Sequence, residues 1–257
     1  MSPLTIVITI IVLVLIIMLI RYIFNDQNTL QNLQNGQTAS TIDATSLATN
    51  GSSVPASNFA YSIWFYVNDW NYRYGEPKVI FGRMGATSNS TTQTSSVPGV
   101  NGLDPCPAVV LGAIENNLAI TLGCYPGVNE EPTTPGGNTV THTCGVANIP
   151  IQKWVNLVLS VYGRTMDIYI DGKLVRTCVL PGVAKIDTNA PIYVTPNGGF
   201  SGWTAKFQYW SDSCDPQKAW NIYEAGYGAS MLSSIFGKYS VKVSLMDGNT
   251  EDSSFSD

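Results

Sequence analysis

The side chains that catalysis would need are sparse in this chain. A single histidine, His142, leaves almost nothing for a Ser-His-Asp triad or a histidine-rich zinc site. Glycoside hydrolysis needs two carboxyl groups close together, one protonated and one ionised. Glu130 and Glu131 are adjacent in a Pro/Gly-rich stretch, and on a strand they would point to opposite faces. We therefore expect no catalytic residue, no metal ligands and no cofactor, and hence a protein that is not an enzyme.

The five cysteines are odd in number and contain no C-x-x-C pair, so we expect no cysteine zinc site. A Cys124–Cys144 disulfide would close a long loop and stabilise the fold by about 3 kcal/mol in the chain-entropy model. A Cys106–Cys124 disulfide is equally open. If the domain faces the cytosol, all five thiols stay reduced.

The segment NDWNYRYGE places Trp70, Tyr72 and Tyr74 at alternating positions. On a strand these rings would form a strip that stacks against a sugar or a neighbouring protein. The alternative is an ordinary aromatic face packed against the core or a loop. The three residues are therefore candidate glycan or protein contacts.

The charge balance argues against nucleic acid as a partner. The formal net charge is −5 and no cluster of Lys and Arg exists, whereas phosphate binding needs concentrated positive charge. The acidic residues near the end, from Asp247 to Asp257, predict a solvated, frayed tail.

The run LTIVITIIVLVLIIMLI, residues 4–20, predicts a transmembrane anchor. As a helix it is about 26 Å long, and residues 21–24 extend it to about 32 Å, close to the thickness of a bilayer core. A cleaved signal peptide is the rival interpretation, but no Lys or Arg precedes the run and no A-x-A-like site follows it. Arg21 flanks the anchor on the side of the large domain, so the positive-inside tendency places that domain on the cytosolic face.

Composition divides the rest of the chain. Residues 25–58 are rich in Gln, Asn, Ser and Thr and predict a polar stalk. Short aromatic and β-branched runs separated by turn residues then predict an antiparallel sandwich over 59–226. VNLVLSVY alternates in polarity, Asp171-Gly172 predicts a hairpin turn, and DPQKAWNIYEAG predicts a short helix that ends at Gly226. Residues 227–257 form a C-terminal extension with one strand and the acidic tail.

Three stretches together resemble the concanavalin A-like, laminin G-type jelly-roll family. They are FAYSIWFYV, WVNLVLSVYGRTMDIYIDGKLV and GGFSGWTAKFQYWSDSCDPQKAWNIYEAG, within residues 59–226. The resemblance implies an all-β, two-sheet jelly-roll sandwich, and to this sandwich the sequence adds the predicted N-terminal transmembrane helix and the short C-terminal helix. It says little of function, because this fold carries many functions.

The anchor, the stalk, the sandwich and the tail together resemble membrane-anchored proteins of large double-stranded DNA viruses. That resemblance implies a minor capsid protein that links an internal virion membrane to the shell, with the large domain facing the capsid. Its partners would be the lipid bilayer, through residues 4–24, and capsid or other virion proteins. The alternative is a membrane-anchored lectin-like module that binds glycans or mediates adhesion.

Overall fold

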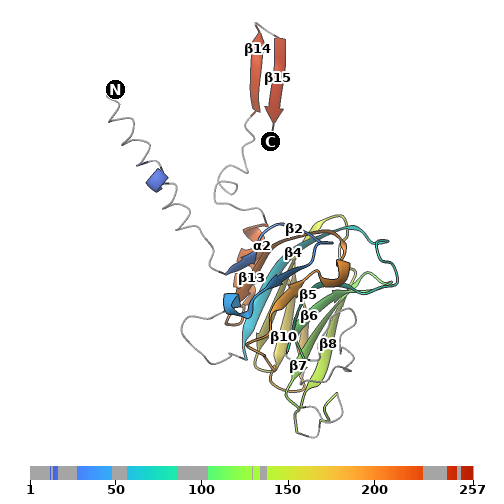
Figure 1. Cartoon of the computed structure of the whole chain (residues 1–257). Coiled ribbons are helices and arrows are strands. Elements are labelled where there is room, and N and C mark those ends of the chain that lie inside the picture. The colour runs from blue at the N-terminus through green and yellow to red at the C-terminus, as the bar shows by residue number, and fades with distance from the viewer. Residues whose placement is uncertain are drawn as a thin grey trace. The chain divides into compact units, whose positions relative to one another are not determined.

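The computed structural model describes residues 12, 14–16, 28–47, 57–85, 104–128, 130–133 and 138–227, and the backbone of 242–247 and 250–256 (Figure 1). The chain forms two compact units. One comprises Asn28–Tyr227 and is a β-sandwich; the other comprises Met1–Gln27 and Gly228–Asp257. In the second unit, β14 (Lys242–Asp247) pairs antiparallel with β15 (Thr250–Ser256). The acidic tail predicted to be frayed is therefore a hydrogen-bonded strand over 250–256.

The first layer of the sandwich is a seven-stranded antiparallel sheet in the order β1-β13-β4-β9-β10-β11, with β2 also paired to β13. Aromatic and β-branched residues dominate its long strands, as expected for half-buried pleated chains. Its strands are β1 (Thr29–Gln31), β2 (Gln34–Asn35), β4 (Phe59–Asp69), β9 (Trp154–Tyr162), β10 (Thr165–Ile170), β11 (Lys173–Val179) and β13 (Ser201–Trp210).

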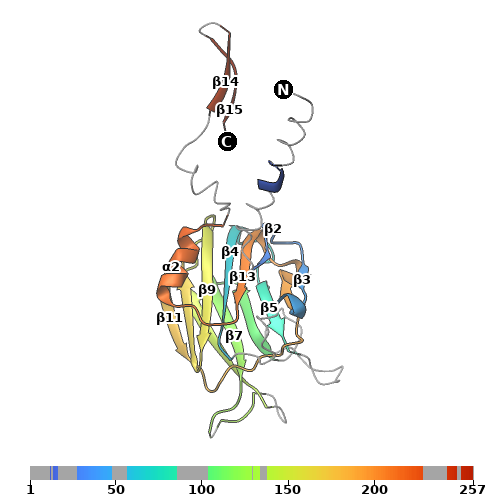
Figure 2. The ribbon, with the colours of Figure 1, turned by 90° about the vertical axis from the view of Figure 1, so that its left-hand side faces the viewer.

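The second layer is a six-stranded sheet in the order β3-β12-β5-β6-β7-β8. Two short 3-10 helices, η1 (Ala44–Leu47) and η2 (Pro196–Gly198), follow β3 and β12. Figure 2 shows the two sheets packed against each other. The strands are β3 (Ser40–Ile42), β5 (Lys78–Met84), β6 (Pro105–Leu111), β7 (Asn117–Cys124), β8 (Val140–Ala147) and β12 (Ile192–Val194).

Strand alternation decides which side chains fill the space between the sheets. In β4, Phe59, Tyr61, Ile63, Phe65 and Val67 belong to the main core, so the residues between them face outward. In β9 the inward set is Val155, Leu157, Leu159 and Val161, as the alternating pattern predicts. The predicted all-β sandwich is thus confirmed.

The hairpin between β10 and β11 turns at Asp171 and Gly172, whose φ angles are 50° and 72°. Glycine adopts this left-handed region without strain, and aspartate tolerates it better than most residues. The Asp171 carboxylate fixes the turn, because it accepts a hydrogen bond from the backbone N–H of Asn156 (2.9 Å) and pairs with Lys153 (3.1 Å).

Helix α2 (Pro216–Glu224) covers part of the outer face of the seven-stranded sheet (Figure 2). It begins after Asp215, which accepts a hydrogen bond from the N–H of Lys218, with Pro216 in the first turn. Ala219 and Ile222 pack against Ala60, Val158 and Tyr169 of the sheet. The predicted helix is confirmed, and the chain leaves it through Gly226 at φ 66°.

The sandwich differs from the prediction at its N-terminal boundary. The predicted stalk, 25–58, contains β1, β2, β3 and η1, and residues 28–47 belong to the sandwich unit. Edge strands need backbone partners more than apolar side chains, which is why so polar a segment can join a sheet. Ile42 and Leu47 are the buried apolar residues that fix it to the core.

Both ends of the sandwich unit are attached to β13. At the N-terminal end, Thr29 pairs with Gln208, and the Asn28 carbonyl accepts a hydrogen bond from the N–H of Tyr209 (3.0 Å). At the C-terminal end, the Gly226 carbonyl accepts a hydrogen bond from Lys206 Nζ (3.0 Å).

The predicted anchor, residues 4–24 with its flanking Arg21, lies outside the described residues except at four positions. Val12, Val14, Leu15 and Ile16 are helical and exposed. Within the part of the chain that the structure describes, no helix is both long and apolar enough to cross a bilayer.

Candidate functional site

The residues first considered for chemistry lie on β8 and in the connection that precedes it. His142 is half-buried on β8, while Glu130 and Glu131 are exposed in the connection between β7 and β8. Among the described residues, no three His, Cys, Asp or Glu side chains are grouped closely enough to hold a metal ion.

The disulfide joins Cys144 on β8 to Cys178 on β11, so both predicted pairings, Cys124–Cys144 and Cys106–Cys124, are wrong. The sheet register explains the first error. Cys144 lies opposite Ile120, and Cys124 lies opposite Val140, four residues further along. Four residues of strand span about 13 Å, whereas bridged Cα atoms are about 4.4–6.8 Å apart.

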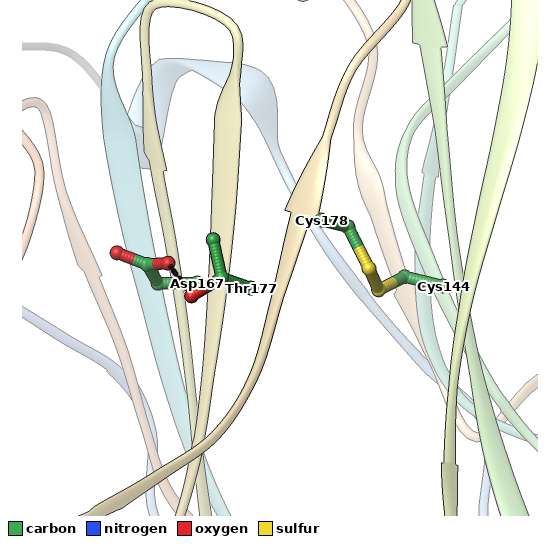
Figure 3. The surroundings of a disulfide bond; sticks show 4 residues. All are labelled: Cys144, Asp167, Thr177 and Cys178. Carbon is green, nitrogen blue, oxygen red and sulfur yellow. Dashed lines mark hydrogen bonds between the residues drawn. A yellow bond between two sulfur atoms is a disulfide. The ribbon is translucent and has the colours of Figure 1, made fainter.

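Figure 3 shows the disulfide between the two sheets, with Thr177 and Asp167 directed to the other side of β11. Because β8 and β11 are the last strands of their sheets, the bond closes one long edge of the sandwich. In the chain-entropy model, the 34-residue separation corresponds to a stabilisation of about 3–4 kcal/mol.

The other three cysteines, Cys106, Cys124 and Cys214, are free and buried. Burial raises the pKa of Cys124 and of Cys214 to about 11, and it also raises the pKa of Cys106. These thiols are therefore protonated at neutral pH, and none has the low pKa of a nucleophilic cysteine.

The predicted contacts Trp70, Tyr72 and Tyr74 lie in the turn after β4 and form no strip. Trp70 is half-buried against the core, and its Nε1–H donates to the carbonyl of Ile114 (3.1 Å). The Lys78 ammonium lies 4.7 Å from the centre of the Trp70 ring. Lys78 is fully buried, and this burial lowers the pKa of its ammonium group. The positive charge of the nearby Arg73 lowers the pKa further. Trp70 thus packs against the core.

Tyr72 and Tyr74 point to different surroundings. The Tyr72 hydroxyl donates to the carbonyl of Gly198 (3.1 Å), while Arg73 pairs with Glu76 and donates to the carbonyl of Asn197. These bonds hold the turn against η2. Tyr74 is 59 % exposed. A role in binding stays a prediction for all three rings.

A second set of aromatic residues gathers on the outer face of the seven-stranded sheet, and we call it the aromatic face. Tyr66 and Trp154 lie opposite each other on β4 and β9, with ring centres 5.8 Å apart. Trp203 on β13 lies opposite Tyr66 on its other side and is 43 % exposed. Trp64 lies two residues before Tyr66 on β4, on the same face of the strand, and completes the set. The aromatic face consists of Trp64, Tyr66, Trp154 and Trp203.

Two tyrosines at the end of α2 cover part of the aromatic face. Tyr223 stacks on Trp64 with ring centres 5.7 Å apart. Tyr227 stacks on Trp154 at 4.2 Å and also contacts Trp64 at 5.5 Å. Each such pair contributes about 0.5–1.5 kcal/mol beyond the burial of its area. Tyr227 is nevertheless 43 % exposed, so its ring is the outer layer of the stack.

Beneath these rings lies a small polar layer. Asn156 is fully buried on β9, and its Nδ2 donates to Ser62 Oγ on β4 (3.2 Å). Its Oδ1 has no hydrogen-bond partner within the described residues, and neither does Nε1 of the buried Trp64 directly opposite. Leaving a buried polar atom unpaired costs about 1–3 kcal/mol.

The sequence contains a signal for half of this site. Alternation places Trp64 and Tyr66 on the face of β4 opposite to Phe65, but both faces are aromatic, so alternation alone does not say which one is exposed. Trp154 and Trp203 join them only through the strand register, and Tyr227 only through the exit of α2. These contacts connect residues up to 163 positions apart (Trp64 to Tyr227).

No protein-family model matches the chain, and a search of curated proteins found no match. Among solved structures it resembles the botulinum neurotoxin serotype D ligand-binding domain in complex with N-acetylneuraminic acid, with a TM-score of 0.50 and 14 % identity over 78 % of this chain. It also resembles the receptor-binding domain of botulinum neurotoxin D, with a TM-score of 0.50 and 13 % identity over 77 % of this chain.

The chain spans less than half of those structures, 45 % and 44 % of their lengths. At this level of identity the likeness is one of fold. The described unit Asn28–Tyr227 is therefore a jelly-roll-like β-sandwich of the kind found in these receptor-binding domains.

Proposed function

We propose that this chain is a non-catalytic recognition module, lectin-like in its mode of binding, that uses the aromatic face to bind carbohydrate. The observation that carries the proposal is the row Trp203, Tyr66 and Trp154, which presents ring surfaces across three adjacent strands. Tryptophan and tyrosine combine a flat apolar ring with a polar tip, which suits the alternating apolar and hydroxylated surfaces of sugars.

Two further observations support carbohydrate over a purely apolar partner. Polar side chains surround the rings: Asn35 lies opposite Trp203, and Asn68 and Gln152 are exposed nearby at the ends of β4 and before β9. The serotype D neurotoxin domain, which shares the fold, is described in complex with N-acetylneuraminic acid.

In this proposal residues 4–24 tether the module to a bilayer, as the sequence predicts. The sequence also predicts a structural role between an internal virion membrane and a capsid. The similar solved structures are receptor- or ligand-binding domains, so we rank recognition first. Cryo-EM of virions that placed the sandwich between a bilayer and a shell would reverse that order.

A glycan array probed with the full chain in lipid nanodiscs tests the proposal. We expect binding to a defined set of glycans, lost in Trp203→Ala and kept in Tyr162→Ala. Tyr162 is the matched control because it is 67 % exposed and lies on the same sheet, outside the aromatic face. Loss of binding in both variants, or no binding to any glycan, would reject the proposal. Cleavage of a bound glycan would reject its non-catalytic part.

A further inference from the structure

The strands at the borders of the two sheets differ in their protection against pairing with another strand. Proteins protect such strands by keeping them short, by charged side chains and by bulges. β1, β2 and β3 have only two or three residues each. β11 carries Lys173 and Arg176, and its pairing with β10 skips Val175. Within its described span, Val140–Ala147, β8 has none of these devices: it has eight residues, no Lys, Arg, Asp or Glu, and no register shift against β7 (Figure 1).

The open edge of β8 consists of the backbone groups of Thr143, Gly145 and Ala147. In an antiparallel ladder, alternate residues direct their N–H and C=O groups to opposite neighbours. The N–H of Thr141 points away from β7, because it donates to Thr133 Oγ1 (2.7 Å). Residues 143, 145 and 147 share this direction, and all three are exposed. Within the described residues, no backbone hydrogen bond reaches this side of them.

The open stretch has a boundary at each end. On one side, Thr133 occupies the place beside Thr141. On the other side, Asn148 leaves the strand with a φ of 58°, and its N–H donates to the carbonyl of Asn116 (2.8 Å). The residues between these boundaries that remain open are 143–147, and Gly145 is their midpoint. An antiparallel copy of the same stretch would therefore pair with it about a two-fold axis at Gly145.

Gly145 has no structural reason within one chain. The ladder between β8 and β7 is regular there, and Gly145 is not among the glycines with a positive φ. The nearest atom to an added Cβ would be the carbonyl oxygen of Leu118, 3.9 Å away, which is ordinary contact. A glycine weakens a strand, and it marks a bulge, a tight bend or the close approach of another backbone. The regular ladder leaves the third of these.

We infer that two copies of this chain associate through β8, so that their six-stranded sheets form one continuous antiparallel sheet. Thr143 of one copy pairs with Ala147 of the other, and the two Gly145 residues pair with each other. These pairs supply about six backbone hydrogen bonds. The symmetric place of Gly145 favours a second copy over an unrelated strand, which would not require glycine at the midpoint.

Charge also favours this pairing. Because β8 has no Lys, Arg, Asp or Glu, an antiparallel copy brings no like charges together. Self-pairing of β11 about its midpoint would set the Arg176 side chains of two copies opposite each other, which is destabilising. The same comparison makes β11 the matched control for β8.

Cysteine cross-linking of the full chain in proteoliposomes tests the register. In Gly145→Cys the new thiols belong to residues about 5.5 Å apart at Cα, within the range of a disulfide. In Thr143→Cys or Ala147→Cys alone, the two copies of the new cysteine are more than about 13 Å apart. The double variant Thr143→Cys/Ala147→Cys brings different positions together again.

Under mild oxidation we expect covalent dimers in Gly145→Cys and in the double variant. Their yield should be about tenfold that of either single variant at 143 or 147, because only the close pairs meet the distance limit of a disulfide. Val175→Cys on β11, where the side chain is 47 % exposed, should stay at the lower yield. The wild-type chain is the blank, since its three free cysteines are buried.

Gly145→Lys tests the contact itself. The space at the Cβ position lets a single chain accept the side chain, whereas two ammonium groups would meet at the axis of the dimer. We expect the dissociation constant of the dimer, from light scattering of the full chain in detergent, to rise at least about tenfold. Val175→Lys should leave it unchanged. Circular dichroism melts show whether each variant folds, and if Gly145→Lys does not, the cross-linking pattern decides.

Three results would overturn the inference. One is a wild-type chain that stays monomeric at every concentration and gives no cross-link in Gly145→Cys. Another is a dimer that survives Gly145→Lys, because its contact then lies elsewhere. The third is a higher cross-linking yield in Val175→Cys than in Gly145→Cys, which would move the contact to β11. None of them bears on carbohydrate binding, because the aromatic face lies on the seven-stranded sheet.

Discussion

Trp70, Tyr72 and Tyr74 lie within five residues of one another, whereas the aromatic face is drawn from strands that begin 142 positions apart in the sequence, at Phe59 and Ser201. The three loop rings have different surroundings: Trp70 packs against the core, Tyr72 holds a turn and Tyr74 faces solvent. The rings of the aromatic face gather, and two polar atoms beneath them stay unpaired within the described residues. Proximity in sequence therefore did not bring the three loop rings together, whereas sheet register did bring together the rings of the proposed binding site.

The largest expected effect comes from Trp70→Ala. It removes a half-buried indole, its hydrogen bond to Ile114 and the ring beneath Lys78, so we expect the free energy of unfolding to fall by about 2–3 kcal/mol. Urea denaturation measures this change. We expect the folded fraction of this variant to bind glycans with the wild-type affinity. A loss of glycan binding by the folded variant would indicate that Trp70 is part of the binding site.

Trp203→Ala gives the opposite pattern. Since the indole is 43 % exposed, stability changes by no more than about 0.5 kcal/mol. The dissociation constant for a bound glycan rises about tenfold, equivalent to about 1.4 kcal/mol. Isothermal titration calorimetry alongside a thermal melt separates the two quantities. An unchanged dissociation constant in Trp203→Ala would contradict the proposed difference between the aromatic face and the loop rings.

Tyr72→Phe isolates one contact of the turn. The change deletes the hydroxyl that donates to Gly198, and we expect about 1 kcal/mol less stability with no change in affinity. The melting temperature from calorimetry reports it. A stability equal to that of the wild type would show that the turn is held by Arg73 and Glu76 without the tyrosine.

Tyr74→Ala has the smallest expected effect. Its ring is 59 % exposed, so both stability and glycan affinity remain within about 0.5 kcal/mol of the wild type. The same denaturation and titration experiments apply. A drop in affinity alone would mean that the predicted loop contact is real and that the binding surface extends past η2.

The local sequence predicts the turns and the helix of this fold better than it predicts contacts between residues far apart in the chain. Asp171-Gly172 and Asp215-Pro216 predict their turn and helix because the causes, a positive φ and a capped first turn, lie within a few residues. The Cys144–Cys178 bond does not follow from spacing, since it depends on which strands end each sheet. Strands β1 to β3 were not predicted for a related reason: most of their side chains are polar, and the strands pair through their backbones with β13 and β12.

The attachment of both ends of the sandwich to β13 has a mechanical consequence. If residues 4–24 hold the chain to a bilayer and a ligand binds at Trp203, as proposed, tension on that ligand passes through β13 to the pairs Asn35–Trp203 and Thr29–Gln208, and from there to the tether. Hydrogen bonds of antiparallel strands run perpendicular to the strands, so a pull along β13 loads these bonds together. Neither pair involves a strand of the six-stranded sheet, so the backbone hydrogen bonds of the seven-stranded sheet would carry such a force.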